Sequence, residues 1–196
     1  MAGKGASSRE KITLIGADMA SRNGIGDVTI GSLAEETGMS KSGLFAHFGS
    51  KENLQLALLE ESGRIFEKSV IQPIMAREPG LQRVVALFEF WFGWTTNAGL
   101  RGGCPVAAAM FEFDDNPSAV RDEISRIDEL WRGMMMNLVQ ETIDRGQFRS
   151  NLDREQFIWE LCGIYLCFHV SSRFSKDPLA RKRAEIAFYA LVERAV

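Results

Sequence analysis

Histidine and cysteine are scarce in this chain of 196 residues, and their scarcity excludes several kinds of site. The two histidines, His47 and His169, lie far apart in the sequence, and no Glu-x-x-His pair occurs. A di-iron centre in a helical bundle and histidine-based catalysis therefore lack their residues. The three cysteines, Cys104, Cys162 and Cys167, include no Cys-x-x-Cys pair, so neither a disulfide framework nor a zinc site is expected. We expect no enzyme activity, no metal site and no cofactor.

Long apolar runs are absent as well. No segment is apolar over the length that spans a membrane, and the N-terminal sequence, MAGKGASSREK, has no signal-peptide core. Because no disulfide framework is expected, the cysteines suit a reducing compartment. We therefore expect a cytoplasmic protein without a membrane partner. The length suffices for a small domain and a larger helical body.

Residues 27–54 predict two short helices joined by a tight turn and followed by the start of a third helix. Thr29 can cap the first short helix and Ser40 the second, because their side-chain oxygens accept hydrogen bonds from free backbone N–H groups. Gly38 lies between them, at a position where glycine adopts the left-handed conformation without steric cost. The segment therefore has the helix caps and the turn glycine that are typical of a helix-turn-helix.

The second short helix has one apolar and one polar side. Leu44 and Phe48 lie four residues apart and must both face the core. The opposite side carries small and polar side chains: Lys41, Ser42, Gly43 and His47. Such a surface directly after a tight turn suits a helix that enters the major groove of DNA. Spacing alone leaves a second interpretation open, in which this is the solvated face of an ordinary helical hairpin.

The same segment resembles the DNA-binding domain of the tetracycline-repressor (TetR) family of bacterial regulators. Twelve residues match the family pattern in order and without gaps: Thr29, Leu33, Ala34, Gly38, Ser40, Leu44, Phe45, His47, Phe48, Lys51, Glu52 and Leu54. The resemblance implies an all-α protein. A three-helix, helix-turn-helix DNA-binding domain (residues 1–51) would precede a helical-bundle domain for ligand binding and dimerisation (residues 52–196).

The resemblance also implies which residues contact a double-stranded DNA operator: Thr29, Ser40, Lys41, Ser42, Gly43, Phe45, His47 and Lys51. Lys51 opens the next helix, where its ammonium and the free N–H groups can hold a phosphate. Phe45 stands where the family usually has tyrosine, so a hydrogen bond from a phenol to phosphate is missing. The net charge is −3, and residues 1–51 hold six basic against five acidic side chains. Few placed contacts, rather than a broad cationic surface, are therefore expected.

The rest of the chain predicts helices and no strand. Ser7 and Glu10 have the spacing of a capping box at the start of the first helix. Asn116 and Pro117 provide a cap and a first-turn proline for a helix whose apolar residues recur in steps of three and four.

Residues 84–94 contain five aromatic side chains, which cannot all share one face of a helix. A helix that is apolar all round is buried among others or lines a cavity. By resemblance this segment matches the central helix of the family's ligand domain. The expected ligand contacts are Phe88, Trp91, Phe92, Phe111, Trp131, Met134 and Phe168, and plain core packing is the alternative for each. Glu89 and Glu112 would suit a lipophilic cation beside these rings, or are simply solvated.

The last two helices are expected, again by resemblance, to form a homodimer as a four-helix bundle with their symmetry mates, with Gly163 allowing close approach. The favoured function is a DNA-binding transcriptional regulator, a repressor that a small lipophilic ligand releases from its operator. A regulator of the same fold that is an activator, or that a protein partner or modification of Cys104 controls, is the alternative. Cys104 opens a short helix, where the dipole and Arg101 favour the thiolate, although a small buried structural side chain is the favoured interpretation of this cysteine. Cys162 and Cys167 are expected to be buried and slower to react.

Overall fold

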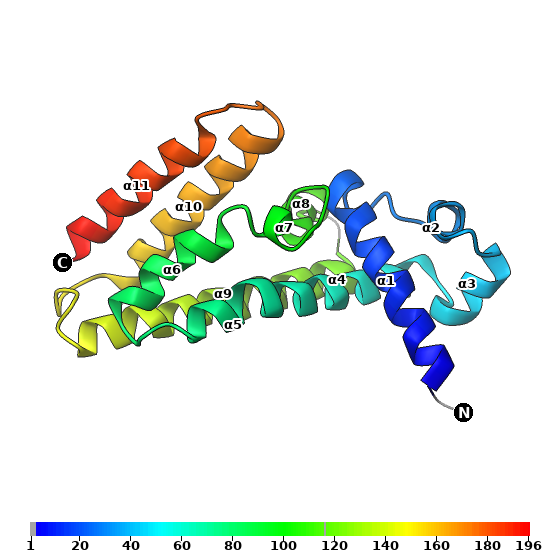
Figure 1. Ribbon diagram of the computed structural model, residues 1–196, viewed down its shortest axis with the longest axis horizontal. Helices are drawn as coiled ribbons and strands as arrows, with labels where there is room; N and C mark the ends of the chain where they lie inside the picture. Colours follow the sequence, from blue (N-terminus) through cyan, green and yellow to red (C-terminus); the bar gives the residue numbers. More distant parts are fainter. Residues whose placement is uncertain (1–2, 116) are drawn as a thin grey trace. The chain divides into compact units, whose positions relative to one another are not determined.

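Every regular element of this computed structural model, which describes residues 3–115 and 117–196, is a helix (Figure 1). The predicted all-α fold class is therefore confirmed. The elements are α1 (Gly3–Asn23), α2 (Ile30–Thr37), α3 (Lys41–Phe48), α4 (Lys51–Phe66), the π-helical turn η1 (Glu67–Ile71), α5 (Gln72–Met75), α6 (Leu81–Trp91), α7 (Trp94–Asn97), α8 (Pro105–Glu112), α9 (Ala119–Asp144), α10 (Arg154–Arg173) and α11 (Ala180–Ala195). Among the described residues no helix is long and apolar enough to cross a membrane, and no group of three or more His, Cys, Asp or Glu side chains is placed to hold a metal ion.

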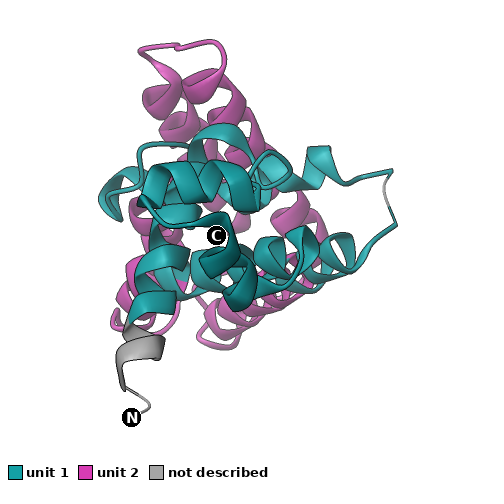
Figure 2. Ribbon diagram, turned by 90° about the vertical axis from the view of Figure 1, so that its right-hand side faces the viewer, with its two compact units in different colours: residues 1–66, 95–127 teal, residues 67–94, 128–196 magenta. Residues whose placement is uncertain are grey.

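The chain divides into two compact units, each built from two stretches of sequence (Figure 2). Unit 1 comprises residues 1–66 and 95–127, and unit 2 comprises residues 67–94 and 128–196. The sequence suggests a boundary after residue 51 between a DNA-binding domain and a ligand-binding domain. This boundary stays a prediction about function, because the two compact units have other boundaries.

A cluster of buried apolar side chains forms the core of unit 1. The N-terminal stretch contributes Ile12, Met19, Ile25, Leu33, Leu44, Phe48, Leu54 and Leu58, among others. Ala109 of α8 and Val120 and Ile124 of α9 belong to the same cluster. Most helical stability comes from such packing rather than from propensity, above all for helices as short as α2 and α3, with eight residues each. Residues 95–127 thus contribute to the core that holds the helix-turn-helix.

Two predicted helix starts differ from the structure. α1 begins at Gly3, so Ser7 lies inside the helix and is not its cap; the side chain of Ser7 is outside the described residues. α9 begins at Ala119, and Arg121 donates its backbone N–H to the Ser118 hydroxyl at 3.2 Å, so Ser118 is the cap. Pro117 therefore precedes the helix, and Asn116 lies outside the described residues.

Pro73 lies inside a helical run. α4, η1 and α5 follow one another from Lys51 to Met75 without a break. Proline has no N–H to donate, and its ring crowds the carbonyl four residues earlier, that of Ser69. The π-helical turn at Glu67–Ile71 changes the bonding pattern at this place, so the run continues through the proline.

Candidate functional site

The turn between α2 and α3 and the caps on either side of it have the predicted geometry. Thr29 and Ser32 form a reciprocal capping box at the start of α2, with both hydrogen bonds at 3.0 Å. Ser40 accepts a hydrogen bond from the backbone N–H of Gly43 at 3.1 Å and so caps α3. Gly38 has a φ of 68°, in the left-handed region. The local sequence therefore fixes how α3 follows α2.

The two sides of α3 differ as predicted. Leu44 is fully buried and Phe48 is 4% exposed, so the inner side is anchored in the core of unit 1. Lys41, Ser42 and Phe45 are exposed, whereas Gly43 and His47 are half-buried. Phe45 is 57% exposed, which leaves its ring free for an apolar contact such as a thymine methyl group. The outer side of α3 has the form that a recognition helix requires.

The remaining two predicted DNA-contact residues lie at the starts of neighbouring helices. Lys51 is the first residue of α4 and is exposed, directly after Ser50, which accepts the N–H of Asn53 at 3.0 Å. Thr29 is half-buried, and its hydroxyl is already engaged in capping α2. Lys51 therefore presents an exposed cation at a helix N-terminus, whereas the hydroxyl of Thr29 has its partner within α2. DNA contact by these residues stays a prediction.

Arg9 of α1 reaches the recognition helix, and sequence reasoning missed it. Its guanidinium donates a hydrogen bond to the carbonyl of His47 at 2.9 Å and lies 5.2 Å from the centre of the Phe48 ring. A cation at the C-terminal end of a helix is favourable because the last carbonyls lack partners there. The contact joins residues 38 positions apart, so no local pattern in the sequence reveals it.

Five of the predicted ligand residues join one network of ring contacts in unit 2: Phe88, Trp91, Phe92, Trp131 and Phe168. Trp91 is edge-on to Trp131 at 5.2 Å, and Phe92 lies 5.5 Å from Phe168. Tyr165, which the sequence analysis did not select, stacks on Trp91 at 4.0 Å. It lies three residues before Phe168 on α10, a spacing that places both on one side of a helix and was available in the sequence. We call these six rings the aromatic network.

Two predicted ligand residues stand apart from these ring contacts. Phe111 belongs to unit 1, where it is 62% exposed on α8. Met134 is half-buried on α9 in unit 2. The two acidic side chains considered for a cation have other partners. Glu89 pairs with Arg77 at 2.9 Å, and Glu112 accepts the N–H of Gly26 at 2.7 Å. Both carboxylates therefore have partners within the protein rather than being simply solvated.

The three cysteines differ in exposure, and one differs from expectation. Cys104 caps α8, accepting the N–H of Ala107 at 3.5 Å, and is 8% exposed. Cys162 is buried, and burial raises the pKa of its thiol despite the nearby guanidinium of Arg132. Cys167 is exposed, so the expectation that it is buried is wrong for the single chain. It lies on the same side of α10 as Trp159 and Gly163, at intervals of four residues, and this side is open.

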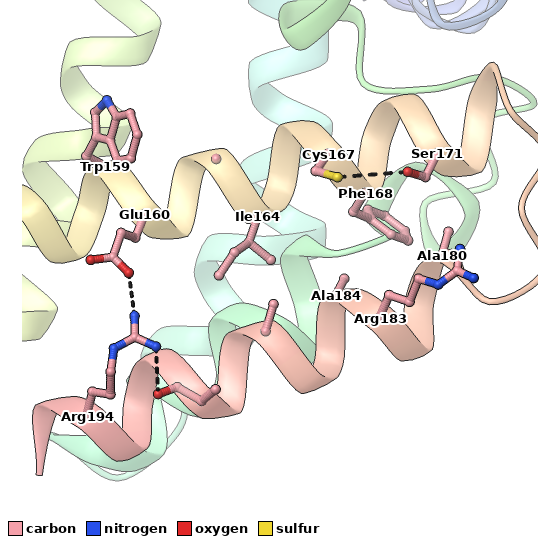
Figure 3. Close-up of a pocket in the computed structure, with 13 residues that line it drawn as sticks. Trp159, Glu160, Ile164, Cys167, Phe168, Ser171, Ala180, Arg183, Ala184 and Arg194 are labelled. Carbon is pink, nitrogen blue, oxygen red and sulfur yellow. Dashed lines mark hydrogen bonds and ion pairs between the residues drawn. The ribbon is translucent and has the colours of Figure 1, made fainter.

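The open side of α10 forms a groove with α11 (Figure 3). The groove has a volume of about 590 Å³ and a mainly apolar lining that includes Trp159, Gly163, Ile164, Cys167, Ala184, Ala187 and Ala190. Trp159 is 69% exposed. At one end the guanidinium of Arg194 pairs with Glu160 and donates to the carbonyl of Ala190 at 3.3 Å. The last two helices therefore share an open, mainly apolar groove.

Two family domains match the chain. Residues 16–58 match the N-terminal domain of bacterial regulatory proteins of the tetR family, and residues 80–188 match the tetracyclin repressor-like C-terminal domain. No curated protein matches the chain. A TetR transcriptional regulator from Chloroflexus aurantiacus J-10-FL is 23% identical, with a TM-score of 0.85 over 97% of this chain and 94% of that chain.

Two further solved structures with this fold carry ligands. FadR from Bacillus subtilis, in complex with stearoyl-CoA, is 14% identical, with a TM-score of 0.72 over 92% of this chain and 96% of that chain. AibR, in complex with isovaleryl coenzyme A and operator DNA, is 18% identical, with a TM-score of 0.70 over 95% of this chain and 97% of that chain. The C-terminal domain match alone covers more than half of the chain. The protein therefore belongs to the TetR family of bacterial regulators, DNA-binding proteins that control transcription.

Proposed function

We propose that this regulator is a repressor that binds its operator as a homodimer and leaves it when a small lipophilic ligand enters unit 2. The observation that carries the proposal is the aromatic network, because it gathers five residues that were selected as ligand contacts from the sequence. Aromatic side chains give a lipophilic ligand large contact areas. The solved relatives that hold stearoyl-CoA and isovaleryl coenzyme A support a ligand with an acyl chain.

Operator contacts are assigned to the outer side of α3 and to the starts of α2 and α4. Lys41 and Lys51 supply charge to phosphates, and Ser42 and Gly43 allow the backbone to approach the groove closely. Phe45 contributes an apolar contact in place of a phosphate hydrogen bond. Ser40 and Thr29 act through the helix starts that they cap, and His47 lies at the far end of α3. Since only a few cations take part, the dependence of affinity on salt is modest, about −0.9 in log K against log salt for each phosphate neutralised.

The α10–α11 groove is assigned to a second copy of the chain. A two-fold dimer places two recognition helices about one helical turn of DNA apart, roughly 34–36 Å. A Cβ atom at Gly163 would meet no atom within 4 Å outside its own stretch of helix, so Gly163→Glu meets no obstacle at this atom in the single chain and puts a charge into the groove. Sedimentation should show a weakened dimer, whereas Gly63→Glu, at an equally open glycine of α4, should not. Equal dimerisation of both variants would refute the assignment.

The ligand proposal is tested with stearoyl-CoA and isovaleryl-CoA as probes, using the fluorescence anisotropy of labelled operator DNA. Binding of ligand and operator must oppose each other reciprocally, so the operator should weaken ligand binding by the same factor. Trp131→Leu should weaken the response, because it removes a ring from the aromatic network. Phe111→Leu also replaces a ring by an aliphatic side chain, at an exposed position of α8. A weaker response in this variant would show that Phe111 contributes to ligand binding, and an unchanged response that it does not. Unaltered operator affinity at saturation with a bound probe would exclude that compound as inducer.

A further inference from the structure

Residues 100–112, the loop before α8 together with α8, are joined to the helix-turn-helix at both ends, and we call this segment the brace. Arg101 makes the first connection. Its backbone N–H donates to one carboxylate oxygen of Asp18 on α1 at 2.8 Å, and its guanidinium donates to the other oxygen at 2.8 and 2.5 Å. The same guanidinium reaches Glu36 on α2 at 3.3 Å. One arginine therefore links three segments of unit 1.

Arg22 completes this arrangement from α1. It lies 3.4 Å from the carboxylate of Asp18 and 3.1 Å from that of Glu36. Two cations thus face two anions, and each carboxylate has two partners. Burial raises the pKa of Asp18, but hydrogen bonds from the side chain and backbone of Arg101 outweigh it, so the pKa lies below its ordinary value. The carboxylate is therefore charged at neutral pH, as the arrangement requires.

Gly102 and Gly103 bring the backbone of the brace against the end of α1. The N–H of Gly103 donates to the carbonyl of Ser21 at 2.8 Å. A Cβ atom on Gly102 would lie 1.8 Å from that carbonyl oxygen and 2.5 Å from the backbone nitrogen of Arg22. Both obstacles are backbone atoms, which cannot rotate away, so only glycine allows this approach.

Glu112 makes the connection at the other end of the brace. Its carboxylate accepts the backbone N–H of Gly26, in the turn between α1 and α2, at 2.7 Å. Between the two ends, Ala109 is fully buried in the core cluster that also contains Leu33 and Leu44. The brace therefore fixes the end of α1, the turn that follows and the outer surface of α2, the elements that position α3.

We propose that the brace holds the recognition helix in the orientation that fits the operator, with Arg101 as its chief positioning residue. Within the described residues, the hydrogen bonds and ion pairs of Arg101 are with Asp18 and Glu36, neither of which lies on α3 or is assigned to DNA. It acts through Asp18 and Glu36. If the binding-competent orientation of α3 is populated only part of the time, the apparent affinity for the operator falls in proportion to that population. The side chains that contact phosphate remain available in either orientation. The proposal needs operator binding only and stands whether or not a lipophilic ligand is the signal.

Two variants break the brace in different ways. Arg101→Gln removes the charge and the bidentate contact to Asp18 at an exposed position, so the fold is retained. Gly102→Ala leaves every charge in place but forces the loop away from Ser21. We expect each to lower affinity for the operator by roughly three- to tenfold, the size of the net contribution of a single ordinary hydrogen bond. Affinity for unrelated DNA should stay the same, so the specificity ratio falls. Arg126→Gln removes an exposed arginine that pairs with Glu123 within α9, and is the matched control.

The salt dependence separates positioning from direct contact. If Arg101 bound a phosphate, Arg101→Gln would reduce the slope of log K against log salt by about 0.9, whereas a positioning residue leaves the slope unchanged. Asp18→Asn should lower affinity as Arg101→Gln does, and the loss in the double variant should be smaller than the two single effects combined, because the two residues share one contact. A reduced slope, additive effects, or normal operator affinity of Gly102→Ala in a folded protein would each overturn the proposal.

Discussion

Ile124 offers a direct test of whether residues 95–127 support the helix-turn-helix. It lies on α9, is 4% exposed and belongs to the core cluster that contains Leu44 and Phe48. Truncating a buried isoleucine to alanine removes apolar contacts and leaves a cavity, which typically costs about 2–5 kcal/mol. The higher helix propensity of alanine returns less than about 0.7 kcal/mol. Leu130 lies six residues further along the same helix, is 60% exposed and should tolerate the same truncation within about 0.5 kcal/mol.

The two variants are compared by urea and thermal unfolding at equal protein concentration, because dimerisation would otherwise shift the midpoints. For a chain of this size Ile124→Ala should lower Tm by roughly 4–20 °C and Leu130→Ala by about 2 °C or less. Hydrogen exchange then shows where the stability is lost. Backbone amides of α2 and α3 should exchange faster in Ile124→Ala and normally in Leu130→Ala. Equal losses in the two variants, or unchanged protection of α3, would show that α9 does not stabilise the helix-turn-helix.

Three further outcomes are expected. Lys51→Ala should weaken binding to every DNA sequence and reduce the salt slope by about 0.9 in anisotropy titrations, and an unchanged slope would remove Lys51 from the interface. Gly38→Ala should destabilise the protein by roughly 1–2 kcal/mol in urea unfolding, because a side chain at a φ of 68° is strained although no atom lies within 4 Å. Burial, with a smaller contribution from Arg173, lowers the pKa of His169 below 6.5, so the unfolded chain takes up a proton that the folded chain does not. Stability should therefore fall as the pH decreases from about 7, since the unfolded state binds more protons there, and His169→Gln should remove this part of the pH dependence in thermal melts.

The features that the sequence predicted well are those that neighbouring residues determine. The caps at Thr29 and Ser40 and the left-handed Gly38 depend on residues within a few positions of one another, and all three are confirmed. The apolar side of α3 follows from a single spacing, from Leu44 to Phe48. The burial of the α6 rings among other helices follows from the sequence, because rings on every side of one helix must find partners on others. Trp131 and Phe168 were selected by the family resemblance, and their contact with a ligand stays a prediction.

The features that were missed depend on contacts between distant residues. Arg9 and His47, or Glu112 and Gly26, have no spacing that a periodicity could reveal. Glu112 was considered for a cation because it follows an aromatic residue, yet its partner is a backbone N–H 86 positions away. Predictions of helix starts were wrong where two residues could be the cap. Ser118 caps α9, although Pro117 is the residue type favoured at the first helical position, which would have placed the cap at Asn116.

The composition of unit 1 follows from the small size of the helix-turn-helix. Helices of eight residues are marginal in water, and a three-helix domain of about 50 residues buries so little surface that its stability by itself is marginal. Here α4, α8 and the start of α9 supply the missing apolar contacts, and the brace supplies the polar ones. These supporting residues lie within the stretch that the sequence assigned to ligand binding. A substitution far from α3 in sequence can therefore change operator affinity through the stability and orientation of α3, with no change in any residue that touches DNA.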